Sequence, residues 1–253
     1  GYDSPVVFQS SRRNESLQIM RAVENNYDLH LVGGTSEDRS SSPKYLCLDL
    51  LPTESRVLSL GLGPPEDNGF EGGMLNAGHK VVSVDPSVPS CYAATLLGRL
   101  FTKFVFMSKA VTKSSGLTKA RCERTNDFEK VGHFSQTYFN KSEQETYKDV
   151  ESTSLGDLIE LFGGFDVLKV NIEGYEYEVI DSIKNMDIAQ VLISFNHNVS
   201  DKYTLDDTLA CVEKMEDMGY ETLDLHTVDP DWIKTPSENF IFIKPSSSKK
   251  IST

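Results

Sequence analysis

Strand-like and helix-like segments alternate from residue 56 to residue 218, and this alternation limits the possible folds more than any other feature of the chain. Short apolar runs predict strands at residues 56–60, 80–84, 103–107, 166–172 and 189–195. Helical spacing and glycine stop signals predict helices over residues 69–77, 90–100, 154–162, 176–184 and 204–218. This order is typical of a mostly parallel sheet covered by helices on both faces.

The end of the chain departs from this order. Residues 221–226 and 239–244 predict two strands with no helix between them. Strands joined in this way favour a C-terminal hairpin, which adds one antiparallel strand to the sheet. Dehydrogenase-type Rossmann domains usually continue with a helix at this point, whereas a closing hairpin is typical of class I methyltransferases. We therefore expect an α/β, Rossmann-like fold of the class I methyltransferase type.

The two ends of the chain predict less regular segments. Residues 1–50 are expected to form an N-terminal helical accessory segment, with an amphipathic helix over residues 12–27. The methyltransferase-type domain is expected to span residues 51–245. The remaining residues, 246–253, are rich in Ser and Lys and predict a disordered tail.

Composition and short motifs limit the partners, metal sites and cellular locations that the chain can have. The formal net charge of −13 argues against a nucleic acid as the main partner, since an acidic surface repels phosphate backbones. No run approaches the roughly 20 apolar residues that a transmembrane helix needs. The four cysteines are widely spaced and form no Cys/His cluster, so we predict no metal site. Three N-x-S sequons leave a secretory or Golgi lumen and the cytoplasm both open as locations.

A glycine loop follows the first predicted strand, in Leu58–Gly63. Ligands of doubly wound sheets bind outside the carboxyl ends of the strands, where glycines allow close approach to the backbone. A tight strand-to-loop turn explains this G-x-G equally well. A dinucleotide loop needs a third glycine, and Glu66 occupies that position. Nearby acids suit the ammonium of S-adenosylmethionine (SAM) better than they suit a pyrophosphate.

An aspartate ends the second predicted strand, 22 residues after Gly63. A carboxylate at this position, Asp85, can accept hydrogen bonds from both hydroxyls of a cofactor ribose. The interval is close to the roughly 20 residues expected for that geometry. SAM and NAD both carry such a ribose, so the loop and Asp85 together predict an adenosine-type ligand and do not choose between the two.

Polar residues interrupt one face of the strand predicted over residues 166–172. Lys169 and Asn171 point to the same face, and Glu173 continues it at the carboxyl edge by the two-residue period of a strand. Buried polar groups need partners or a ligand. A Lys169–Glu173 pair within the protein is one interpretation, and a catalytic site is the other.

Methyl transfer to a hydroxyl requires alignment and a base that takes up the hydroxyl proton. Glu173 is the first candidate for this base, and His197 is the second because imidazole titrates near neutral pH. Lys169 is a candidate for neutralising the developing alkoxide or for holding Glu173. Further residues in less regular segments are candidates for substrate contacts or for ordinary loop packing: His133, Tyr138, Phe139 and Trp232.

With these motifs, the sequence resembles the FkbM family of SAM-dependent methyltransferases. The matching stretches are residues 57–63, 69–86, 154–158 and 166–180. The last stretch is similar to the family signature, in which Lys, Asp, a Glu-Gly pair and a second Glu are separated by apolar or variable residues. Residues 69–86 also look like the methyltransferase-like animal branch of the family. The resemblance implies a seven-stranded sheet, SAM as cofactor and methyl transfer, commonly to oxygen.

The resemblance assigns Gly61, Gly63 and Asp85 to SAM. The cofactor site is further expected to include Leu60, Pro86, Ala110 and Asn171. The sequence departs from the family pattern at three places, which are Asn171 in place of the signature aspartate, Pro65 in place of a frequent third glycine, and the absence of an acid in Ser194–His197.

The expected reaction is O-methylation of a hydroxyl on a glycan or a small molecule. Two other classes stay open. One is a catalytically inactive SAM-binding module, which the departures at Asn171 and Ser194 would allow. The other is a Rossmann oxidoreductase that uses a nicotinamide cofactor, which Glu66 and the closing hairpin disfavour.

Overall fold

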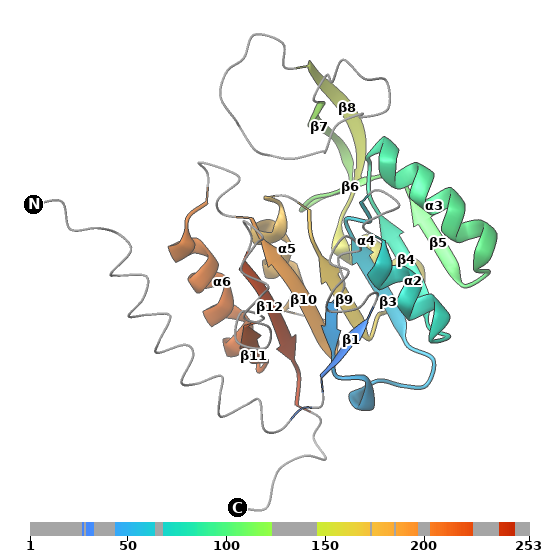
Figure 1. Ribbon diagram of the computed structural model, residues 1–253. Coiled ribbons are helices and arrows are strands. Elements are labelled where there is room, and N and C mark those ends of the chain that lie inside the picture. Colours follow the sequence, from blue (N-terminus) through green and yellow to red (C-terminus); the bar gives the residue numbers. More distant parts are fainter. Residues whose placement is uncertain are drawn as a thin grey trace, which may run out of the picture.

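The computed structural model describes most of the predicted domain (Figure 1). The described residues are 27, 29–32, 44–63, 68–122, 146–172, 174–184, 186–196, 203–224 and 238–245. The helix predicted over residues 12–27 and the tail predicted over residues 246–253 therefore lie outside the described residues, apart from Tyr27.

A seven-stranded sheet forms the centre of the fold, in the order β11-β12-β10-β9-β3-β4-β5. Its strands are β3 (Arg56–Leu60), β4 (Lys80–Val84), β5 (Phe104–Met107), β9 (Val167–Val170), β10 (Gln190–Phe195), β11 (Glu221–Asp224) and β12 (Glu238–Ile243). β12 is antiparallel to both β10 and β11, whereas β10, β9, β3, β4 and β5 pair in parallel. The predicted sheet with one antiparallel strand is confirmed.

Helices cover both faces of this sheet, as the alternating pattern predicts (Figure 1). They are α2 (Gly69–Asn76), α3 (Val88–Leu100), α4 (Leu155–Phe162), α5 (Glu176–Ile183) and α6 (Leu205–Asp217). One core holds apolar residues of α4, α5 and α6, and the other holds those of α2 and α3. β9 and β10 are buried along their whole length because they lie between the two layers. None of the helices in the described part of the chain combines the length and apolar character needed to cross a membrane.

Side-chain caps fix where several helices begin and end. Ser87, Ser154 and Thr204 each accept a hydrogen bond from a backbone N–H in the first turn of α3, α4 and α6. Thr204 and Asp207 form a reciprocal capping box at α6. Gly163 ends α4 in the left-handed region, with φ of 80°. These local signals explain why the predicted helix boundaries agree with the structure within one or two residues.

The described part of the first 50 residues contains strand and 3-10 helix. β1 (His30–Val32) and β2 (Lys44–Leu46) pair antiparallel, and the 3-10 helix η1 spans Leu48–Leu50. Leu46 and Cys47 are fully buried in the same core as α2. This segment therefore completes the layer that covers one face of the sheet, which the expectation of a helical accessory segment did not include.

A small second sheet follows β5. β6 (Ala110–Val111), β7 (Gly116–Cys122) and β8 (Thr146–Thr153) form three strands in the order β6-β8-β7. β6 begins three residues after β5 ends, and Figure 1 shows β7 and β8 projecting beyond that end of the central sheet. Residues 123–145, which connect β7 to β8, lie outside the described residues.

A side chain of the central sheet holds the N-terminal segment in place. Gln190, fully buried in β10, accepts a hydrogen bond from the Cys47 N–H at 2.9 Å and donates one to the Cys47 carbonyl at 2.7 Å. Both backbone groups of a buried residue are thus satisfied by a single amide side chain.

We predict that Gln190→Ala lowers the free energy of unfolding by about 2–4 kcal/mol, because it removes two buried hydrogen bonds to the Cys47 backbone. Urea denaturation at equilibrium measures this change. Lys214→Ala is the control, since the Lys214–Asp181 ion pair is half exposed on both sides and its loss costs less than about 1 kcal/mol. A Gln190→Ala effect no larger than that of the control would contradict the prediction.

Candidate active site

The strand order changes direction between β3 and β9, and the loops that follow these strands meet at this point. The chain proceeds from β3 to β4 and β5 on one side, and from β9 to β10 on the other. Leu60, the last residue of β3, pairs with Val84 of β4 and with Val170 of β9. The three strands therefore end level with one another, at the place where open α/β sheets bind their ligands.

The glycine loop passes directly against the end of β9. Gly61 has a φ of 88° and Gly63 a φ of 77°, both in the region that favours glycine. The Gly61 N–H donates to the Val84 carbonyl at 3.0 Å, and the Asn171 N–H donates to the Leu60 carbonyl at 2.9 Å. A Cβ at Gly61 would lie 1.9 Å from the Asn171 carbonyl oxygen, so only glycine fits there.

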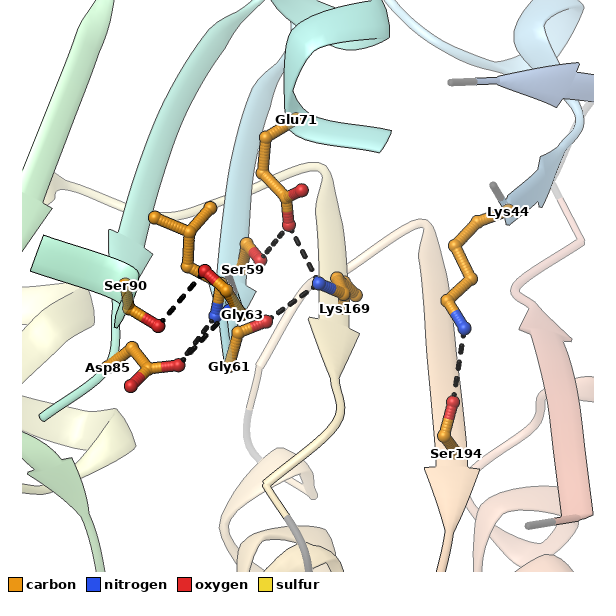
Figure 2. Close-up of polar contacts among 10 residues, drawn as sticks. Lys44, Ser59, Gly61, Gly63, Glu71, Asp85, Ser90, Lys169 and Ser194 are labelled. Carbon is orange, nitrogen blue, oxygen red and sulfur yellow. Dashed lines mark hydrogen bonds and ion pairs between the residues drawn. The ribbon is translucent and has the colours of Figure 1, made fainter. Parts of the chain in front are cut away.

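The half-buried carboxylate of Asp85 caps the same loop from β4. Its Oδ2 accepts from the N–H groups of Leu62 at 2.9 Å and Gly63 at 3.3 Å, and its Oδ1 accepts from the Ser87 N–H at 2.8 Å (Figure 2). The Ser90 hydroxyl donates to the Gly63 carbonyl at 3.2 Å. A carboxylate has about four acceptor positions, so these described contacts leave one, on Oδ1, for a ligand hydroxyl.

A buried ion pair lies beneath the loop. The Lys169 ammonium donates to the Gly61 carbonyl at 2.7 Å and to Glu71 Oε1 at 2.8 Å. The Ser59 hydroxyl donates to the same carboxylate oxygen at 2.5 Å. Figure 2 shows the Lys169 ammonium between the carboxylate of α2 and the loop. The Lys169 and Glu71 side chains are 3% and 0% exposed, so solvent does not screen this pair.

Glu176, at the start of α5, holds the turn that follows β9. Its Oε1 accepts from the Ile172 N–H at 2.9 Å and from the Asn196 side chain at 2.8 Å, and its Oε2 accepts from the Gly174 N–H at 2.7 Å. Burial raises the pKa of Glu176 to about 7, against the lowering effect of these hydrogen bonds. One carboxylate thereby fixes the ends of both β9 and β10.

A second buried lysine reaches the end of β10. The Lys44 ammonium of β2 donates to the Ser194 hydroxyl at 3.2 Å, and that hydroxyl donates to Asn239 at 2.5 Å. Burial, together with the positive charge of Lys169, lowers the pKa of Lys44 to about 7, against the raising effect of Glu71. Ser194, near the end of β10, is thus part of a buried polar cluster.

The structure brings most of the predicted cofactor residues together. Leu60, Gly61, Gly63, Asp85 and Asn171 meet at the ends of β3, β4 and β9. Pro86 follows Asp85 and is half-buried, and Ala110 is buried in β6, beyond the end of β5.

Other predicted residues lie outside the described residues. They are Glu173, His197, His133, Tyr138, Phe139 and Trp232. The proposed Lys169–Glu173 pair is therefore not described, and the partner that the structure gives to Lys169 is Glu71. Among the described residues, no group of three His, Cys, Asp or Glu side chains is arranged to hold a metal ion.

Glu71 and Ser59 were not predicted as site residues from the sequence, and Glu176 was placed in the family signature without an assigned role. A signal for Glu71 exists, since the buried face of α2 consists of Phe70, Glu71, Met74 and Leu75. A charged residue within such an apolar stripe requires a buried partner.

The strand order with antiparallel β12, the positive-φ glycine loop and the carboxylate at the end of β4 define a class I SAM-dependent methyltransferase. The chain belongs to the FkbM methyltransferase family, because residues 24–222 match the Methyltransferase FkbM domain. The Gly61 cradle and the remaining acceptor position of Asp85 fit SAM, the cofactor of this family.

Three solved structures are similar to this chain at low sequence identity. A fibrillarin/Nop5p complex is 11% identical at a TM-score of 0.46, over 78% of this chain and 75% of that chain. Aeropyrum pernix fibrillarin with natively bound SAM is 11% identical at a TM-score of 0.44, over 76% and 69%. Precorrin-6y C5,15-methyltransferase from Geobacter metallireducens is 10% identical at a TM-score of 0.41, over 78% and 83%. A comparison with curated protein sequences gives no significant match.

We predict that Gly61→Ala abolishes measurable SAM binding, because the added Cβ collides with the Asn171 backbone and the left-handed φ disfavours alanine. Isothermal titration calorimetry with SAM measures the loss. Gly72→Ala is the matched control, since a Cβ there meets nothing within 4 Å and alanine favours the helix. Equal SAM affinity of the two variants would contradict the close packing of the loop on β9.

The raised pKa of Glu176 implies that the free energy of unfolding depends on pH. Its folded-state pKa of about 7 lies above the ordinary value of 4.5, so between these pH values the folded protein holds a proton that the unfolded chain has released. The stability from this group is present below about pH 4.5 and is lost as the pH rises through about 7. We expect the stability difference between wild type and Glu176→Gln to shrink from pH 5 to pH 8 in urea denaturation. A constant difference over that range would contradict this expectation.

Proposed function

We propose that this protein transfers the methyl group of SAM to a hydroxyl oxygen of a glycan or small molecule. The observation that carries the proposal is the meeting of the glycine loop, Asp85 and the ends of β9 and β10 at one edge of the sheet. The net charge of −13 favours an acceptor other than a nucleic acid.

In this proposal SAM lies across the ends of β3 and β4. The backbone of Gly61–Gly63 would contact its methionine end, and the free position on Asp85 Oδ1 would accept one ribose hydroxyl. Leu60, Pro86, Ala110 and Asn171 would line the rest of the site.

Bound SAM supplies a methyl group activated on a sulfonium sulfur. The protein's own task is to align the acceptor hydroxyl and to take up its proton. We propose Glu173 as the base, with His197 as the second candidate. Glu176 supports both, because it binds the backbone on either side of Glu173, at Ile172 and Gly174, and the Asn196 side chain next to His197.

The deciding experiment is a screen with isotope-labelled SAM against glycans, small hydroxy compounds and protein extracts. Transfer to a hydroxyl-bearing acceptor supports the proposal, and transfer confined to protein extracts would replace the acceptor class. SAM binding without any transfer would favour a non-catalytic SAM-binding module. Tight NAD binding without SAM binding would favour a nicotinamide-dependent enzyme.

With an acceptor identified by this screen, we predict that Glu173→Gln lowers the rate of methyl transfer by about 10²–10⁴-fold, which is the usual contribution of a general base. The affinity for SAM should stay unchanged, because the amide keeps the shape of the side chain. Glu160→Gln, an exposed position on α4, is the control. Full activity of Glu173→Gln would remove Glu173 from the mechanism, and the same test on His197→Asn would follow.

A further inference from the structure

The ion pair between Lys169 and Glu71 joins the sheet, a helix and the cofactor loop. Lys169 lies on β9, Glu71 lies on α2, and the Gly61 carbonyl belongs to the loop between β3 and α2. The Ser59 hydroxyl of β3 supports the carboxylate from the strand that precedes the loop. Figure 2 shows Glu71, Ser59 and Lys169 meeting next to Gly61 of the loop.

A buried ion pair such as Lys169–Glu71 contributes little net stability to the folded protein. Burying two charges carries a desolvation cost that their attraction often fails to exceed, and apolar residues of the same volume frequently stabilise a protein more. Glu71 also makes its described hydrogen bonds through Oε1, while its buried Oε2 has no hydrogen-bond partner among the described residues. The pair therefore has a role beyond stability, which depends on the backbone group that Lys169 binds.

The group that it holds is a backbone oxygen of the cofactor loop. The Gly61 N–H is already fixed by the Val84 carbonyl, and Asp85 fixes the next two N–H groups. Lys169 adds the contact to the Gly61 carbonyl, at 2.7 Å. Four backbone groups between Gly61 and Gly63 are then hydrogen-bonded to the rest of the protein, which fixes the surface that the loop presents to a ligand.

We propose that Glu71 and Lys169 act as a positioning pair for SAM: Lys169 fixes the Gly61 carbonyl, and Glu71, with Ser59, fixes the Lys169 ammonium. Neither residue touches the cofactor. Lys169 thus acts through the loop, and not on the alkoxide. The inference rests on the SAM site proposed at this loop and is independent of the identity of the acceptor.

A double-mutant cycle separates positioning from stability. The full chain is prepared as wild type, Glu71→Gln, Lys169→Met and the double variant, and each is measured by thermal unfolding and by calorimetry with SAM. Each single variant leaves a buried group without its partner, so both should lower the melting temperature and raise the Kd for SAM at least tenfold. In the double variant the melting temperature should return close to that of wild type, because both charges are gone.

The SAM affinity of the double variant decides the question. If the pair positions the loop, the Kd stays raised about tenfold although stability has recovered, because the Gly61 carbonyl is no longer held. If the pair is merely structural, the Kd recovers together with the melting temperature, and the proposal is overturned. Lys214→Met, which removes an exposed ion pair, should change neither quantity.

Two other results are possible, which are a double variant that does not fold and a wild-type protein that does not bind SAM. If the double variant does not fold, Ser59→Ala replaces it, since it keeps both charges and removes one hydrogen bond to Glu71. A folded Ser59→Ala protein with a Kd raised about threefold supports the positioning role, and an unchanged Kd overturns it. A wild-type protein that binds no SAM would overturn the SAM site itself, which distinguishes that failure from failure of the pair alone.

Discussion

The parallel pairing of β3 with β9 is the constraint on which the site depends. It sets Ser59 level with Lys169 and Leu60 level with Val170. The loop after β3 must then pass within contact distance of the Asn171 backbone, and the residue at the closest approach has to be glycine. The same register places Lys169 directly beneath the loop, where its ammonium reaches the Gly61 carbonyl.

Three carboxylates organise the edge of the sheet around this pairing, and each holds a different segment. Asp85 binds the N–H groups of the glycine loop, Glu71 binds the lysine that holds the loop carbonyl, and Glu176 binds the turn after β9 together with Asn196. Asp85 and Glu176 thus bind backbone groups directly, and Glu71 acts on the backbone through Lys169. This arrangement gives a preformed site, because loops that are already fixed lose less conformational entropy when a ligand binds.

The central sheet could be predicted because its strands are short apolar runs and its helices carry strong caps. Ser154 and Gly163 frame α4, and Thr204 and Asp207 begin α6, so local sequence and tertiary structure agree. β1 and β2 were missed because their stability comes from distant partners, such as the contact of Gln190 with Cys47, which no local pattern records. The polar stretch over residues 113–150 lacks an apolar period and allowed a strand followed by an insertion, so it did not reveal the pairing of β7 with β8.

The candidate site could be predicted from the sequence only in part. Gly61 and Asp85 follow from strand ends and spacing, which sequence shows directly. The partner of Lys169 did not follow, because residues 71 and 169 are brought together only by the packing of α2 on the sheet. Sequence spacing had offered Glu173 as that partner, four residues away.

The most direct test of the account is a crystal structure of the full chain with SAM bound. We predict a ribose hydroxyl within hydrogen-bond distance of Asp85, the methionine end against Gly61–Gly63, and the Lys169 ammonium still on the Gly61 carbonyl. SAM bound away from the ends of β3 and β4, or at this edge with Asp85 bonded only to its own backbone, would contradict it.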